Sequence, residues 1–177
     1  WAHLGRVAVL GTWLLLHAIN IVMMQAGFAM LEMGSVRVKS AKSILFKNIC
    51  DFGVSALAWY FVGFGLAGPG ASGADGHDYF VRREQNFLPW VHSFALAVTT
   101  ATIVGGAVAE RMTISSYLIE SLLLIGVVYP VIVSWCWDGD GWLAELGYVD
   151  FAGSGVVHLC GGVAAVVSAA VVGPRFM

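Results

Sequence analysis

The sequence has few charged residues. Only 11% of its 177 residues are Asp, Glu, Lys or Arg, against roughly a quarter in soluble domains, while 59% are hydrophobic and the mean hydropathy is +0.82. The formal net charge of −2 and the lack of a basic block argue against nucleic acid as a partner. We therefore expect an integral membrane protein surrounded by a lipid bilayer.

Cysteine is also scarce, and known hydrolase signatures are missing. Cys50, Cys136 and Cys160 lie in apolar surroundings without CxxC spacing, which argues against a disulfide framework or a zinc site and favours buried thiols. No GxSxG, HExxH or Ser/Lys signature supports a hydrolase built from His158 with Glu120 or Asp150. We expect neither an enzyme nor a cofactor.

Long apolar runs are abundant. A helix needs about 20 apolar residues to cross the hydrocarbon core. Five runs meet this need, approximately at residues 8–31, 43–68, 87–109, 112–137 and 151–174. The sequence thus predicts an all-α, polytopic membrane protein of one domain, with its two chain ends on opposite sides.

The charges between these runs differ by side. Basic residues follow helices one, three and five, at Arg37, Lys39, Lys42, Lys47, Arg111 and Arg175, with Glu32 among them. The segment after helix four holds Asp138, Asp140, Glu145 and Asp150 without a base, and the loop Gly68 to Asn86 is mixed in charge. The positive-inside rule makes the basic side cytoplasmic. We expect the N-terminus outside, most simply in the plasma membrane.

Ionisable residues within the predicted spans are functional candidates, because a charge at a helix centre costs about 2.5 to 3.5 kcal/mol on insertion scales. Lys47 and Asp51, four residues apart, are expected to pair near the membrane surface. Glu110 and Arg111 are expected to form a cytoplasmic cap or a clamp between helices. Glu120 lies deeper, and the sequence names no partner for it.

Helix one carries further polar residues. His17, Asn20 and Gln25 either line a path or form hydrogen bonds with a neighbouring helix. His92, near the outer start of helix three, is placed where its ring can reach water. Glycines, 22 in number, mainly indicate close helix packing.

His158 stands in the apolar stretch "VDFAGSGVVHLCGG". Asp150 or Ser154 can cap the start of helix five, which places His158 inside that span. A neutral imidazole both donates and accepts hydrogen bonds, which no aliphatic side chain does. The pattern alone leaves two interpretations open, a histidine satisfied in the core and a functional histidine.

Three motifs resemble the ammonium transporter family (Amt/Mep/Rh). They are "MQAGFAMLEMGSVRVKS" (Met24 to Ser40), "ATIVGGAVAERM" (Ala101 to Met112) and "VDFAGSGVVHLCGGVAAVV" (Val149 to Val167), in the family's order and spacing. The resemblance covers nearly all of the chain and is weakest in the loop Gly68 to Asn86. It implies an eleven-helix, N-terminus-outside fold of two inverted five-helix repeats plus a final helix, assembled as a homotrimer with one pore per subunit.

By this resemblance, residues 1–177 are the first repeat, and we expect the sequence to be incomplete at its C-terminus. Inverted-repeat transporters form their path between repeats, so the stretch alone is not expected to conduct. The implied substrate is ammonium, which loses a proton at an aromatic outer mouth and crosses a hydrophobic pore as ammonia. An ammonium sensor and a non-conducting fragment are the alternatives, and a cytoplasmic regulatory protein is a further expected partner.

The resemblance also assigns residues. His158 is similar to the first of two pore histidines, Asp150 to an acidic residue that orders the outer mouth by holding backbone, Trp137 to a tryptophan facing external ammonium, and Tyr129 to a tyrosine of the same vestibule.

The sequence departs from the family at the outer gate. Leu96 replaces a usual gate phenylalanine, and Ser93 replaces a glutamine. Phe94 is two residues from Leu96, so on a helix it points elsewhere. Trp135 and Trp142 are weaker candidates for the tryptophan role, because "WDGDGW" is one residue longer than the shortest family version.

Overall fold

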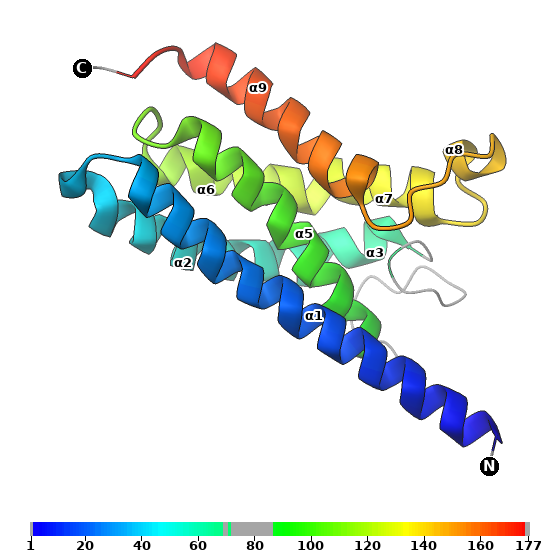
Figure 1. The fold of residues 1–177 in the computed structure, drawn as a ribbon. Coiled ribbons are helices and arrows are strands. Elements are labelled where there is room, and N and C mark those ends of the chain that lie inside the picture. The colour runs from blue at the N-terminus through cyan, green and yellow to red at the C-terminus, as the bar shows by residue number, and fades with distance from the viewer. Residues whose placement is uncertain (1, 69–70, 72–86, 176–177) are drawn as a thin grey trace.

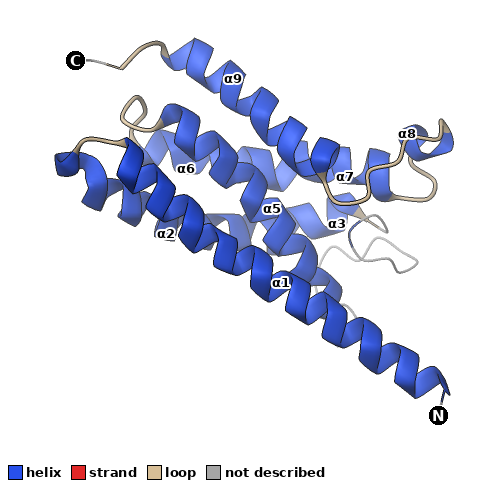
Figure 2. Cartoon of the chain, in the orientation of Figure 1, coloured by secondary structure: helices blue, strands red, loops and turns tan. Residues whose placement is uncertain are grey.

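The computed structural model describes residues 2–68, 71 and 87–175, and every regular element in these ranges is helical (Figure 2). Five helical segments are long and apolar enough to cross a membrane: Ala8–Ser35, Val38–Ala67, Phe87–Val108, Ile114–Glu145 and Ser154–Val172. The predicted all-α fold with five spans is therefore confirmed. Most of the predicted outer loop between Gly68 and Asn86 lies outside the described residues.

Several spans are built from more than one element. The first is α1 (Ala2–Ser35), and the second joins η1 (Val38–Ser40), α2 (Ala41–Ala58), η2 (Trp59–Gly63) and α3 (Phe64–Ala67). The third is α5 (Phe87–Val108), and the fourth joins α6 (Ile114–Leu123), η4 (Leu124–Val128), α7 (Tyr129–Trp137) and, after a turn, α8 (Trp142–Glu145). The fifth is η5 (Ser154–Leu159) followed by α9 (Cys160–Val172). Here η2, η4 and η5 are π-helical turns, which in proteins are frequent at functional sites.

Helix α5 is the centre of the bundle, with α1 and α9 on its flanks (Figure 1). Two thirds of the residues in the apolar stretch of α5 are buried, compared with 11% of those in the apolar stretch of α1. Small residues allow this close packing. Where α9 meets α5, a Cβ on Gly161 would lie 2.9 Å from the carbonyl oxygen of Thr100. The start of α1 and the end of α9 lie at opposite ends of the bundle, as an odd number of spans requires.

The predicted pair of Lys47 with Asp51 is wrong. Helix α1 continues to Ser35, and Lys47 Nζ donates to Oε2 of Glu32 on α1 at 2.8 Å, with both side chains 5% exposed. Asp51 instead accepts hydrogen bonds from the hydroxyls of Tyr117, at 3.0 Å, and Ser121, at 2.5 Å, both on α6. Neighbouring helices supply closer partners than the next turn of α2 does.

Glu110 forms the predicted clamp between helices. It has a φ of 60°, a left-handed conformation rare for a non-glycine residue. Its carboxylate accepts from Arg37 Nε at 2.8 Å and Ser40 Oγ at 2.7 Å, and Arg175 lies 3.6 Å away. The hydrogen bonds from Ser40 and Arg37 lower the pKa of Glu110 to about 2. Basic segments that follow spans one and five therefore meet the end of span three.

Gly63 is expected to tolerate no side chain. A Cβ there would lie 2.6 Å from the carbonyl oxygen of Ile125 and 2.5 Å from the Trp59 ring. Because backbone cannot yield as a side chain can, Gly63→Ala should lower the free energy of unfolding by about 1 to 3 kcal/mol. Unfolding in mixed detergent micelles measures this.

Gly53 on α2 provides the matched control for Gly63. Nothing lies within 4 Å of a Cβ added at Gly53. Gly53→Ala should therefore be neutral or stabilising by up to about 1 kcal/mol. Equal effects of the two substitutions would contradict close packing at Gly63.

Candidate functional site

Asp150 organises the turn that begins the fifth span. Its Oδ1 accepts from the backbone N–H of Gly153 at 2.8 Å and of Ser154 at 3.0 Å. Its Oδ2 accepts from the N–H of Gly155 and of Val156, both at 2.8 Å. These are donors that the first turn of a helix leaves without an intrahelical partner. Of the two predicted caps, Asp150 is therefore the main one.

The charge of Asp150 is stabilised by the same contacts. Burial by itself would raise the pKa of Asp150, but the four backbone N–H donors outweigh burial and hold the pKa below its usual value. Gly153 adopts a φ of 88°, a left-handed conformation that glycine adopts readily. The turn therefore depends on both the carboxylate and this glycine.

Trp137, at the end of α7, is tied to this turn. Its indole Nε1 donates to the backbone carbonyl of Asp150 at 2.8 Å. This bond fixes the indole ring beside a cavity of about 470 Å³. The lining residues come from four spans, from Ala71 after the second span, and from the turn: His17, Trp59, Ala71, His92, Ser93, Leu96, Tyr129, Val133, Trp137, Val149, Asp150, Phe151 and Ala152.

The cavity brings together five of the six residues expected along the substrate path, namely Ser93, Leu96, Tyr129, Trp137 and Asp150. Tyr129 is fully buried and packs against Trp59, with ring centroids 5.6 Å apart. The hydroxyl of Ser93 accepts from Trp59 Nε1 at 3.3 Å and donates to the Pro89 carbonyl at 2.8 Å. The cavity wall is thus mainly aromatic and apolar.

Phe94 points away from Leu96, as predicted. It stacks on Trp90, with centroids 5.3 Å apart, and meets Phe52 edge to face at 5.2 Å in the core. Leu96 is therefore an aliphatic group on the cavity wall, and Phe94 does not replace the missing aromatic gate.

His158 does not join the cavity. It lies in the π-helical turn η5, and its side chain is exposed on the surface of this chain. A histidine satisfied in the core of the five-helix unit is thereby contradicted. The exposed imidazole stands next to exposed Leu159, at a surface with no partner among the described residues.

Sequence reasoning missed the association of His17 with His92. His17 Nδ1 and His92 Nε2 are 2.9 Å apart, and both residues line the cavity. The positions are 75 residues apart. Only the presence of two histidines near the outer ends of two spans could have suggested the contact.

Gln25 serves helix packing, one of its two predicted roles. Its Nε2 donates to Thr99 Oγ1 at 2.8 Å, and its Oε1 accepts from Thr102 Oγ1 at 2.7 Å. Asn20 donates to the Leu16 carbonyl of its own helix at 3.0 Å. The Gln25 amide therefore joins α1 to α5, whereas the Asn20 amide bonds within α1.

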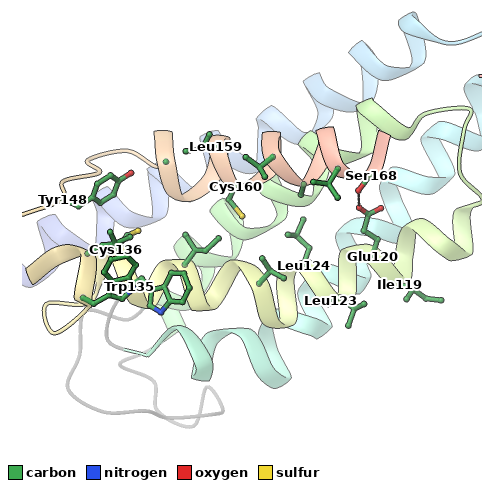
Figure 3. A pocket seen from close by; sticks show the side chains of 18 of the residues that line it. Ile119, Glu120, Leu123, Leu124, Trp135, Cys136, Tyr148, Leu159, Cys160 and Ser168 are labelled. Carbon is green, nitrogen blue, oxygen red and sulfur yellow. Dashed lines mark hydrogen bonds between the residues drawn. The ribbon is translucent and has the colours of Figure 1, made fainter. Parts of the chain in front are cut away.

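A second hollow is an apolar groove of about 830 Å³ between the fourth and fifth spans. Figure 3 shows Trp135, Cys136 and Tyr148 toward one end and Glu120, with its partner Ser168, toward the other. The weaker tryptophan candidates Trp135 and Trp142 line this groove, away from the cavity. The structure thus favours Trp137 for the cavity.

The sequence of the chain is similar to those of one family of known proteins. The sequence profile of the Ammonium Transporter Family matches residues 12–177. Ammonium transporter Amt1 of Haloferax mediterranei is 38% identical over 92% of this chain and 34% of its own length. Ammonium transporter Amt2 of Archaeoglobus fulgidus is 39% identical over 92% of this chain and 38% of its own length.

A solved structure shares the fold. The crystal structure of Candida albicans Mep2 superposes with a TM-score of 0.78 at 27% identity, over 93% of this chain and 39% of that chain. The chain thus spans roughly two fifths or less of the length of these relatives. By its sequence and by its fold, the chain belongs to the ammonium transporter family.

Proposed function

We propose that this chain supplies the outer binding site and one wall of the path in a protein that transports ammonium across a membrane. One observation supports this most strongly: five of the six residues expected at such a path line one aromatic cavity. The names of the relatives, which are ammonium transporters, support the substrate. We further propose that the chain acts as the first of two inverted repeats.

The cavity has the chemistry to hold a small cation at a partly dehydrated mouth. Trp137 and Tyr129 present aromatic rings, and a cation over such a ring gains about 0.5 to 2 kcal/mol. Asp150 acts indirectly, because both of its oxygens are engaged by backbone N–H groups. Leu96 contributes an apolar wall and no cation–π contact.

His158 is proposed to face the path at the junction with the second repeat. Its exposure on this chain leaves it free to contact another set of helices. There it would hydrogen-bond ammonia in transit, while potassium, which has no proton to lose, would meet an apolar pore. We place the assembly as a homotrimer in the plasma membrane with the N-terminus outside. The basic segments at the Glu110 clamp would then lie on the cytoplasmic side.

A chimera tests the function. This chain is joined to the part of Archaeoglobus fulgidus Amt2 that follows the matched segment, and uptake of ¹⁵N-ammonium into proteoliposomes is measured. The chimera should take up ammonium and exclude potassium. His158→Ala should lower uptake at least tenfold or abolish discrimination against potassium, whereas Val166→Ala, at an exposed position of α9, should leave both unchanged.

The outcomes separate the alternatives. Wild-type flux and selectivity in His158→Ala would contradict the role of His158. Ammonium binding to the chimera without flux would contradict transport and favour the sensor alternative.

A further inference from the structure

His17 and His92 form a hydrogen-bonded pair that joins two spans. His17 comes from α1 and His92 from α5, and their ring centroids lie 5.2 Å apart at an interplanar angle of 20°. Trp13, one turn before His17, stacks on the His17 ring at 5.7 Å and 14°. The two imidazoles are therefore held parallel, with His17 Nδ1 and His92 Nε2 at hydrogen-bond distance of 2.9 Å.

This hydrogen bond constrains the protons of the neutral pair. One of the two facing nitrogens carries the proton and the other supplies the lone pair. A neutral imidazole has one N–H and one lone pair, so the two outward nitrogens, His17 Nε2 and His92 Nδ1, must also differ. One outward nitrogen is a base and the other is a donor. The two roles exchange when the outward base gains a proton, the shared proton shifts to the other ring, and the outward donor loses its proton.

The pair stands where a proton acceptor would meet ammonium. Both histidines line the cavity of about 470 Å³ with Trp137, Tyr129 and Asp150. The other titratable groups described on its wall are Asp150, whose two oxygens accept from four backbone N–H groups, and the phenol of Tyr129. Among the described lining residues, the two imidazoles alone offer a nitrogen lone pair.

We propose that the His17–His92 pair accepts the proton that ammonium loses at the outer mouth and returns it to outside water. The inference rests on the proposed function. One N–H bond of ammonium breaks, its electron pair stays on nitrogen, and ammonia leaves toward the pore. The lone pair on the outward basic nitrogen forms the new N–H bond, which makes the pair a monocation. The outward N–H at the other ring then gives its proton to water, and the shared proton shifts between the rings. No electrons are transferred.

The first test uses uptake by the chimera from pH 5 to 8. His17→Phe and His92→Phe keep an aromatic ring but remove the nitrogens, while His92→Gln keeps hydrogen bonding but accepts no proton at these pH values. Uptake should fall at least tenfold in all three variants, since general bases contribute roughly 10² to 10⁴-fold. Uptake should also change less between pH 5 and 8, because the variants lack an imidazole that titrates in this range. Asn20→Leu, on the same helix, is the control and should leave rate and pH profile unchanged.

The second test does not require transport. The chain, with ¹⁵N-labelled histidine, is placed in lipid nanodiscs, and its imidazole nitrogen signals are followed by NMR. A coupling across the His17–His92 hydrogen bond is expected, together with signal shifts on adding ammonium chloride that potassium chloride at equal concentration does not produce.

The two tests distinguish failure of the pair from failure of transport. If the unmodified chimera transports and the Phe or Gln variants keep its rate and pH profile, the inference is overturned while the proposed function stands. If the chimera does not transport, the NMR result decides. Ammonium-specific shifts at both imidazoles support the pair as the acceptor site, and their absence overturns it.

Discussion

Replacing Lys47 by methionine is expected to lower the free energy of unfolding by about 3 to 5 kcal/mol, because a buried charge loses its partner. Lys47 Nζ donates to Glu32 Oε2 at 2.8 Å and lies 4.4 Å from the centre of the Tyr117 ring. Asp51, on the next turn of α2, is also buried. Without Lys47, two carboxylates would share this interior with only hydroxyl and amide donors. Unfolding in mixed detergent micelles measures the loss.

A double variant isolates the pair of charges. Glu32→Leu combined with Lys47→Met removes both partners, so it should recover most of the stability that Lys47→Met loses. Lys42→Met, at an exposed position one turn before Lys47, should change stability by no more than about 0.5 kcal/mol. A double variant as unstable as the sum of the two single variants would show that Glu32 and Lys47 do not interact.

Asp150→Ala is expected to destabilise the fold and to abolish the ammonium binding that we propose at the cavity. Four backbone N–H groups would lose a charged acceptor. Because water replaces some of these hydrogen bonds, the free energy of unfolding should fall by about 2 to 4 kcal/mol. The carbonyl that holds the Trp137 indole belongs to the same residue, so disorder in the turn would release that ring from the cavity.

Two measurements check Asp150→Ala. Unfolding gives the stability change, and the indole N–H signal of Trp137 reports ring position with and without ammonium. Asp150→Asn keeps one carbonyl oxygen and should have an intermediate effect. Asp140→Ala, an exposed acidic position in the preceding turn, serves as control. Unchanged stability together with an unchanged Trp137 signal in Asp150→Ala would refute this role of Asp150.

The candidate site was only partly predictable. Local signals limited the cap of the fifth span to Asp150 or Ser154, and the structure selects Asp150. Trp137, Tyr129, Leu96 and Ser93 came from resemblance, and the structure gathers them with Asp150 in one cavity. The contact of His17 with His92 required the crossing of α1 and α5, which no local pattern encodes.

The sequence by itself determined the five spans, the segregation of basic and acidic connections, and the family. It could do so because backbone polar groups in lipid must bond within a helix, so the length of an apolar run alone defines a span. Tertiary structure alone decided the partners. Lys47 was near Asp51 along its own helix, yet it bonds to Glu32, 15 residues earlier, since both groups face the same interior. It likewise decided that His92 contacts His17, because side-chain contacts between helices depend on how the helices cross, here α1 and α5.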